Sequence, residues 1–269
     1  MIGIRQVRFD VSRRFWKYTM NSYPIIDDLL AGLPEEPVPV RSVLVGAHWT
    51  AVCSTGCGLA TTIAGDTPHD HKTLVRGVGH LHEKTAQELA AYALSENPLE
   101  ASIGVAAINS LLAVDERDAV EINAAEVLMK RGAKKNIALV GHFPFIPRLR
   151  TVAGNLWVLE QHPTGDDFPA EAAGDLIPKA DLVALTASAL INHTMDSLLG
   201  LCKPDAQVLI LGPSTPLSPV LFDHGATIIA GSRVIDETTV LSAVGQGATF
   251  QQVRGVRLLS FTRPGTGAI

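Results

Sequence analysis

Six continuous apolar runs between residues 136 and 261 constrain the fold of this chain more than any other feature. They read NIALVGHF, LWVLEQ, DLVALTAS, QVLILGP, ATIIAG and VRLLSF, and most are separated by stretches long enough for a crossover helix. A strand that is apolar on both faces is buried on both faces, which is typical of a parallel sheet between two layers of helices. The second half of the chain is therefore predicted to be a parallel α/β domain.

The first half of the chain carries a different pattern. Residues 5–33 mix apolar and charged positions and predict a helical arm that Pro24 divides. The prolines of residues 33–40 predict an extended connector, and residues 42–52 and 58–63 are typical of strands. Strands that precede a group of helices indicate a smaller α+β domain.

Three helix starts follow these strands, each with its own capping signal. They are the capping box Thr85-x-x-Glu88, the pair Asn97-Pro98, and Asp118-x-x-Glu121, whose helix is expected to end at Lys130-Arg131-Gly132. The change of pattern after the third start predicts two domains, residues 1–118 and residues 119–269.

Charge and hydropathy narrow the partners. The chain has 269 residues, a net charge of −5 and 18% charged residues. Such a chain lacks the broad cationic surface that binds nucleic acid or an anionic membrane. No uncharged apolar run approaches the roughly 20 residues that cross a bilayer, and the first residues lack a signal-peptide core. We therefore expect a cytoplasmic protein without nucleic-acid or membrane partners.

The three cysteines are Cys53, Cys57 and Cys202. An odd and small number of cysteines in a chain of this length is typical of a reducing compartment rather than of a disulfide framework. They are therefore predicted to be thiols.

The carboxyl ends of the predicted parallel strands are where a ligand would bind in a Rossmann-like domain. These ends are Gly141–Pro144, Glu160, Thr186–Thr194, Gly212–Pro216 and Gly231–Arg233. Because parallel strands end at the same rim of a sheet, the five segments are predicted to surround one pocket.

His142 and Glu160 are the titratable candidates at this rim. His142 fits a metal ligand or a proton carrier, or else a histidine bonded to a neighbouring loop. Glu160 follows Gly141 by 19 positions, the spacing at which Rossmann folds place an acid on a ribose, although it also fits an ordinary polar strand end. The bulky GHFPFIP loop replaces G-x-G-x-x-G, so a pyrophosphate is disfavoured.

Hydroxyl and amide groups follow the other strands. Ser214 and Thr215, in a loop stiffened by prolines, are predicted to hold an anionic part of the ligand, with Ser218 capping the next helix. One of Asn192 and Thr194 is predicted to cap the helix near residues 195–201 and the other to face the cleft.

Four histidines, His69, His71, His80 and His82, gather in the first half of the chain. Two histidines at positions i and i+2 of an extended segment face the same side and fit a shared divalent metal. No zinc-type spacing is matched, so a solvated histidine-rich loop is the competing interpretation.

These motifs together resemble a known family. Val140-Gly141-His142-Phe143-Pro144, Asn192-His193-Thr194, Gly212-Pro213-Ser214-Thr215-Pro216 and Ala230-Gly231 are similar to the DUF364 family, whose label is heavy-metal chelation. The segments around Val45–Val52 and Asn97–Asn109 resemble its companion DUF4213 domain. The resemblance implies an enolase N-terminal-like α+β domain before a Rossmann-like domain, a site in the cleft between them, and a heavy or transition metal or a metal-bearing cofactor.

Carried onto this chain, the resemblance implies ligand contacts at the strand ends, namely Gly141, His142, Glu160, Asn192, Thr194, Gly212, Ser214, Thr215 and Gly231. The leading hypothesis is a protein that binds a small molecule or metal complex through His142 and Glu160, with or without a reaction on it. The alternatives are a nucleotide- or S-adenosylmethionine-dependent transferase and a structural subunit without a small ligand. A homodimer is the default oligomer.

Overall fold

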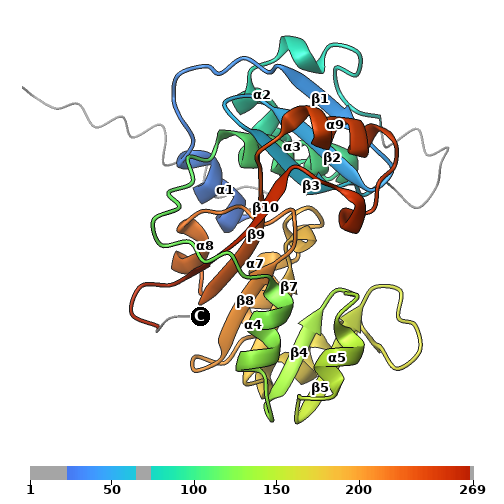
Figure 1. Ribbon diagram of the computed structural model, residues 1–269, viewed down its shortest axis with the longest axis vertical. Helices are drawn as coiled ribbons and strands as arrows, with labels where there is room; N and C mark the ends of the chain where they lie inside the picture. Colours follow the sequence, from blue (N-terminus) through green and yellow to red (C-terminus); the bar gives the residue numbers. More distant parts are fainter. Residues whose placement is uncertain (1–22, 65–73, 267–269) are drawn as a thin grey trace, which may run out of the picture.

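Two sheets organise the chain in the computed structural model, which describes residues 23–64 and 74–266 (Figure 1). The smaller sheet is antiparallel, in the order β1 (Ser42–Val45), β2 (Trp49–Cys53), β3 (Cys57–Thr61). The larger sheet has seven strands in the order β10-β9-β8-β7-β4-β5-β6. Their bounds are β4 (Asn136–Val140), β5 (Asn155–Glu160), β6 (Phe168–Pro169), β7 (Leu182–Thr186), β8 (Gln207–Leu211), β9 (Ile228–Val234) and β10 (Val256–Thr262).

The larger sheet confirms the predicted Rossmann-like domain, because β4 to β9 are all parallel. From β4 the chain first builds outward through β5 and β6 and then crosses back to β7 on the other side. The sheet therefore has a topological switch point between β4 and β7, the place where open α/β sheets bind ligands.

The last strand corrects the prediction of a fully parallel sheet, since β10 pairs antiparallel with β9. The connection between them contains α9 (Glu237–Gly245) and the short helix η8 (Phe250–Gln252), which pack on the small domain rather than on a face of the large sheet. The chain therefore re-enters the sheet from the rim at which β9 ended, and an antiparallel strand results.

Both faces of the large sheet are covered, as the continuous apolar runs predict. Alternate residues of β4, β5, β7, β8 and β9 enter two different cores. Ile137 and Leu139 of β4 pack beneath α4 (Ala124–Arg131) and α5 (Ile146–Arg150), whereas Ala138 faces the opposite core. On the sheet, that second core lies under α6 (Ala173–Leu176), η6 (Ile177–Lys179), η7 (Ala187–Leu190), α7 (Met195–Gly200) and α8 (Val220–Asp223).

One helix from each half of the chain packs on the domain formed by the other half. The small sheet packs on α3 (Pro98–Leu111) with one face, and its other face is covered by α9, whose Val240 and Val244 join a core with Ala51 and Leu59. In return, α1 (Pro24–Ala31) packs on α7 and α8 of the large domain (Figure 1). α1 and α9 therefore each pack on elements from the other half of the chain, and the division into residues 1–118 and 119–269 stays a prediction.

The small domain confirms some local predictions and corrects one strand. Residues 42–52 form the hairpin β1–β2 rather than a single strand, because the Gly46 N–H donates to the Trp49 carbonyl across a tight turn. The capping box of Thr85 and Glu88 starts α2 (Ala86–Ala90), which continues into η4 (Ala91–Leu94). Asn97 caps α3 by accepting from the Leu99 N–H at 3.0 Å.

The prediction of the third helix start is wrong. The helix begins at Ala124 rather than after Asp118, with Asn123 as the cap that accepts from the Glu126 N–H. The residues before it cannot turn into a helix because Val120 exchanges two backbone hydrogen bonds with Ser260 of β10. The predicted end at Lys130-Arg131-Gly132 is confirmed.

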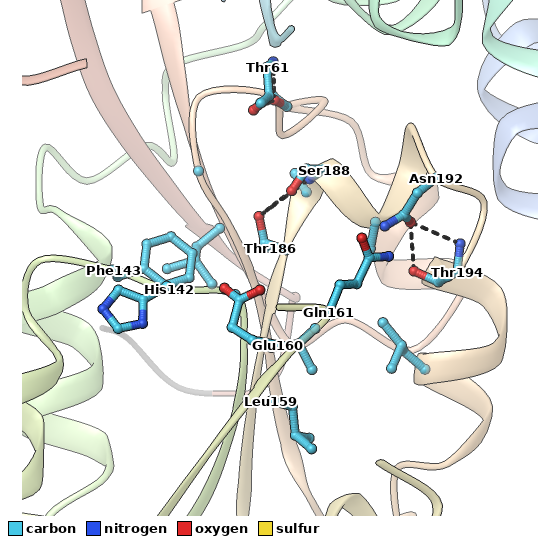
Figure 2. Close-up of a pocket in the computed structure, with 18 of the residues that line it drawn as sticks. Thr61, His142, Phe143, Leu159, Glu160, Gln161, Thr186, Ser188, Asn192 and Thr194 are labelled. Carbon is cyan, nitrogen blue, oxygen red and sulfur yellow. Dashed lines mark hydrogen bonds between the residues drawn. The ribbon is translucent and has the colours of Figure 1, made fainter. Parts of the chain in front are cut away.

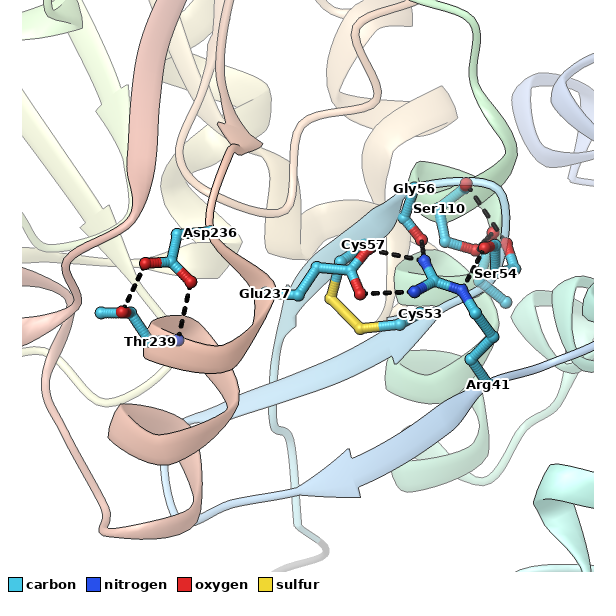
Figure 3. The surroundings of a disulfide bond; sticks show 10 residues. Arg41, Cys53, Ser54, Gly56, Cys57, Ser110, Asp236, Glu237 and Thr239 are labelled. Atoms are coloured by element: carbon cyan, nitrogen blue, oxygen red, sulfur yellow. Dashed lines mark hydrogen bonds and ion pairs between the residues drawn. A yellow bond between two sulfur atoms is a disulfide. The ribbon is translucent and has the colours of Figure 1, made fainter.

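Two of the three cysteines correct the thiol prediction. Cys53 and Cys57 lie opposite each other in the β2–β3 register and form a disulfide (Figure 3). Only Cys202 is a free thiol, and burial raises its pKa to about 11. Spacing alone did not reveal the pair because a tight hairpin, rather than a cysteine motif, brings the two residues together.

The helices within residues 23–64 and 74–266 are all too short or too polar to span a bilayer. The longest, α3, has 14 residues, well below the roughly 20 that a membrane crossing requires. The predicted absence of a membrane-spanning helix therefore holds for this part of the chain.

Candidate functional site

A cavity of about 670 Å³, here called the cleft pocket, lies where the large sheet meets the small domain (Figure 2). Four of the five predicted strand-end segments line it, those that begin at Gly141, Glu160, Thr186 and Gly212. Trp49, Thr61 and Ile63 of the small domain form the facing wall. The pocket therefore occupies the switch point of the sheet.

Gly141 makes the first turn of this site possible. It follows β4 with φ +106°, a conformation that favours glycine, and an added Cβ would lie 3.0 Å from Thr186 and from the ring of Phe143. The Phe143 ring thus covers the backbone at the end of the first strand. A pyrophosphate would need this same position, so the structure agrees with the predicted lack of a dinucleotide loop.

Glu160 is the acid of the pocket. It ends β5, is half-buried, and its carboxylate points into the cavity on the side of Thr186 in Figure 2. Within the described residues it makes no hydrogen bond or ion pair. A carboxylate away from bulk water gains from a cation or a hydrogen-bond donor.

His142 lies at the mouth of the pocket, with 56% of its side chain exposed. Its Nδ1 is 3.3 Å from Oδ2 of Asp167, a residue in the loop between β5 and β6 whose side chain is 4% exposed. This contact matches the alternative interpretation of His142, a histidine bonded to a neighbouring loop, and a functional role for His142 stays a prediction. Such a contact orients the ring and leaves Nε2 for another partner.

Hydroxyl and amide groups line the side of the pocket formed by β7 and the turn after it. Thr186 and Ser188 share a hydrogen bond of 2.7 Å, and Asn192 accepts from the hydroxyl of Thr194 at 2.7 Å (Figure 2). Neither Asn192 nor Thr194 caps α7 with its side chain, which corrects the capping prediction. The two residues bond to each other instead, and both line the cavity.

Ser214 and Thr215 are buried. The Ser214 oxygen accepts from the Thr61 N–H at 2.8 Å, and the Thr215 hydroxyl donates to the Gly212 carbonyl at 2.7 Å. Ser214 lines the cleft pocket, whereas Thr215 does not. The Ser214 bond fixes the loop after β8 against the small domain, and the Thr215 bond closes that loop on itself.

The prediction that the fifth strand ends at Gly231 is wrong. It lies inside β9, which continues to Val234, and it is absent from the lining of the cleft pocket. The run ATIIAG stops being apolar before the strand ends, because the last residues of β9 pair with the antiparallel β10 at the sheet edge.

The lining of the cleft pocket carries negative charge. Among its described lining residues Glu160 is the single carboxylate, His142 is the single imidazole, and neither lysine nor arginine occurs. The sequence prediction of an anionic ligand part at the 212–216 loop therefore has no cation in support. The lining favours neutral donors, a cation or a metal centre.

The described part of the histidine-rich segment does not line this site. His69 and His71 lie outside the described residues. His80 contacts Glu83 at 3.0 Å, and neither His80 nor His82 lines the cleft pocket. In the described part of the chain no three His, Cys, Asp or Glu side chains gather as a metal site would require.

Some lining residues were missed by sequence reasoning. Thr61 and Trp49 come from the small sheet. Phe250 comes from η8, in the connection between β9 and β10 that packs on the small domain. Nothing in their local sequence indicates a site, because their position depends on how the domains pack. The strand-end argument could have included Gln161, because this residue directly follows Glu160 and also lines the pocket.

Two family models match separate parts of the chain. The model of the DUF364 family, described as "Putative heavy-metal chelation", matches residues 123–262, more than half of the chain. The chain belongs to the DUF364 family. The DUF4213 model, with the same description, matches residues 26–112, so the predicted family resemblance is confirmed for both halves.

Relatives of this DUF364 protein include an uncharacterized protein of Methanocaldococcus jannaschii, 30% identical over 164 residues. That match covers 57% of this chain and 62% of the relative, so less than two thirds of the relative's length is spanned.

Two solved structures share the fold. A DUF364 protein of unknown function from Desulfitobacterium hafniense DCB-2 has a TM-score of 0.76 and 25% identity, covering 90% of this chain and 98% of that chain. A DUF364 protein of unknown function from Pyrococcus horikoshii has a TM-score of 0.75 and 22% identity, with 89% and 98% covered. Together with the observed sheets, they confirm the predicted α/β architecture.

Proposed function

We propose that this DUF364 protein binds a small metal-bearing ligand in the cleft pocket, with Glu160 and His142 as the side chains that meet it. The observation that carries the proposal is the Glu160 carboxylate, which faces a cavity without a cationic side chain among the described residues. A guest with positive charge would remove this imbalance. The family description agrees with such a guest.

A metal complex fits this site better than a bare ion. Divalent transition metals take four to six ligands, and the pocket offers one carboxylate and one imidazole. A complex would bring the remaining donors itself, and a cavity of about 670 Å³ has room for an organic chelator. The hydroxyls and amides of Thr186, Ser188 and Asn192 would then hydrogen-bond that chelator.

The proposal is tested by calorimetric titration with aqueous Cu²⁺ and with the Cu²⁺–iminodiacetate complex. We expect one site per chain that binds the complex more tightly than exposed histidines do. Glu160→Gln and His142→Ala should each weaken it about tenfold, since the first removes the negative charge and the second removes the imidazole nitrogen. Glu171→Gln and His162→Ala change exposed neighbours outside the pocket and are the matched controls. Equal binding by the wild type and both site variants would overturn the proposal.

S-adenosylmethionine is the second candidate, favoured by one specific observation. Glu160 ends the strand next to β4, the place where Rossmann-like folds hold ribose hydroxyls. This molecule carries a positive sulfonium and no phosphate, so neither the acidic lining nor the Phe143 ring opposes it. A rise in Tm with S-adenosylmethionine but not with the copper complex would favour this candidate instead.

A further inference from the structure

A second cavity, here called the side pocket, lies against the loop after β8. Its volume is about 430 Å³, and it shares Phe143, Pro144, Leu211, Gly212, Pro213 and Phe250 with the cleft pocket. These shared residues are mostly apolar and form the partition between the two cavities. The rest of the side pocket comes from α4, α5 and the strands β9 and β10.

The walls of the side pocket are largely hydrocarbon. Ile122, Ala124 and Ala125 form the wall beside α4, and Leu258 and Leu259 of β10 form the wall at the sheet edge. Leu258 is 39% exposed, which is high for a leucine in a strand. Phe143 and Phe145 stack with ring centroids 5.1 Å apart, so an aromatic face is available to a planar guest.

Arg148 is the one charged side chain among the described residues of this lining. It lies on α5 and is exposed, and its guanidinium makes no hydrogen bond or ion pair with another described residue. The two cavities therefore carry opposite charges on the two sides of an apolar partition, Glu160 in the cleft pocket and Arg148 in the side pocket.

We propose that the side pocket is a separate binding site for an organic anion that combines an aromatic or other flat apolar group with a carboxylate or sulfonate. The apolar group would lie between the Phe143–Phe145 pair and Leu258, and the anionic group would bond the Arg148 guanidinium. A guanidinium binds such planar or tetrahedral oxyanions through two N–H donors. This site does not depend on a metal complex in the cleft pocket.

The test uses two fluorescent probes with the same ring system. Anilinonaphthalene sulfonate carries the anionic group, and phenylnaphthylamine lacks it. We expect the sulfonate to bind one site per folded chain, and Arg148→Ala to weaken its affinity about tenfold. Arg148→Lys should restore part of that affinity, and added salt should weaken wild-type binding more than binding by Arg148→Ala. Phenylnaphthylamine should bind the wild type and Arg148→Ala equally.

Arg150→Ala is the matched control, because Arg150 lies on the same helix and is exposed but does not line the cavity. Glu160→Gln changes the lining of the cleft pocket but not of the side pocket, so sulfonate binding should stay unchanged. This variant therefore distinguishes a failure of the present proposal from a failure of the proposed function. Each variant is checked for an unchanged Tm. Sulfonate binding that is insensitive to Arg148→Ala, or equally weakened by Arg150→Ala, would overturn the proposal.

Discussion

Arg41 and Glu237 join the two domains through a two-bond ion pair (Figure 3). Both contacts between the guanidinium nitrogens and the carboxylate oxygens are 2.6 Å, and Arg41 Nε also donates to the Ser54 carbonyl at 2.8 Å. The Glu237 carboxylate raises the pKa of Arg41 above its already high value. Arg41, which precedes β1, therefore ties the β2–β3 turn to Glu237, the first residue of α9.

The first prediction concerns this pair. Arg41→Ala should lower the free energy of unfolding by about 1 kcal/mol, because the side chains are part exposed but held in a bidentate geometry. Urea denaturation of both single variants and of the double variant with Glu237→Gln would give their coupling energy. Arg254→Ala, at an exposed position, is the control. A coupling energy of zero would show that the pair contributes nothing.

The disulfide gives the second prediction. It closes a loop of five residues, from Cys53 to Cys57, and the loss of its constraint on the unfolded chain should cost about 2 kcal/mol. A phosphine reductant should therefore lower the Tm of the wild type. The same reductant should leave the Tm of the double variant Cys53→Ala, Cys57→Ala unchanged. An equal response of both proteins would mean that this bond is not the one being reduced.

The third prediction concerns pH and the ion pair of Glu100 with Arg76. Glu100 is buried at the start of α3 and accepts from Arg76 Nε at 3.0 Å and from the Ser95 hydroxyl at 2.6 Å. Burial raises the pKa of Glu100, but the hydrogen bonds from Arg76 and Ser95 outweigh it, so the pKa lies below the ordinary value of 4.5. A lowered folded pKa means that this stabilisation is complete above pH 4.5 and is lost as the pH falls through the folded pKa.

Arg76→Ala should therefore destabilise the protein by about 2 kcal/mol at pH 7, because a buried carboxylate loses its charged donor. The difference from the wild type should shrink as the pH falls below 4.5. Urea denaturation at pH 7 and below pH 4.5 measures this difference in the free energy of unfolding. Arg117→Ala breaks an exposed pair with Asp115 and should have little effect at either pH. A difference that grows on acidification would contradict the assignment.

The fourth prediction concerns the close approach of β3 to α3. A Cβ on Gly58 would lie 2.1 Å from the Ala106 carbonyl oxygen and 2.5 Å from the Ser110 nitrogen, and backbone atoms cannot move aside cheaply. Gly58→Ala should destabilise the protein by about 3 kcal/mol. Gly200→Ala, at the end of α7 with open space around the added Cβ, should instead stabilise it by about 0.5 kcal/mol. Chemical denaturation distinguishes these opposite signs.

Local sequence signals predicted much of the fold. Continuous apolar runs located six of the seven strands of the large sheet, because a strand buried on both faces needs apolar residues at every position. They missed β6, whose two residues are exposed at the sheet edge. Capping residues located the starts of α2 and α3, since the bonds they make span only a few residues. The parallel order also brought Gly141, Glu160 and Thr186 to one rim without any knowledge of the packing.

Long-range packing decided the remaining features. The direction of β10, the late start of α4 and the disulfide all depend on which segments pair across the sheet or hairpin. The burial of Ser214 depends on a contact with Thr61, 153 positions away in the chain. Local sequence by itself determined the elements, because their periodicity and caps are short-range. Only the tertiary structure decided which side chains remain available to a ligand, because that depends on partners brought together by domain packing.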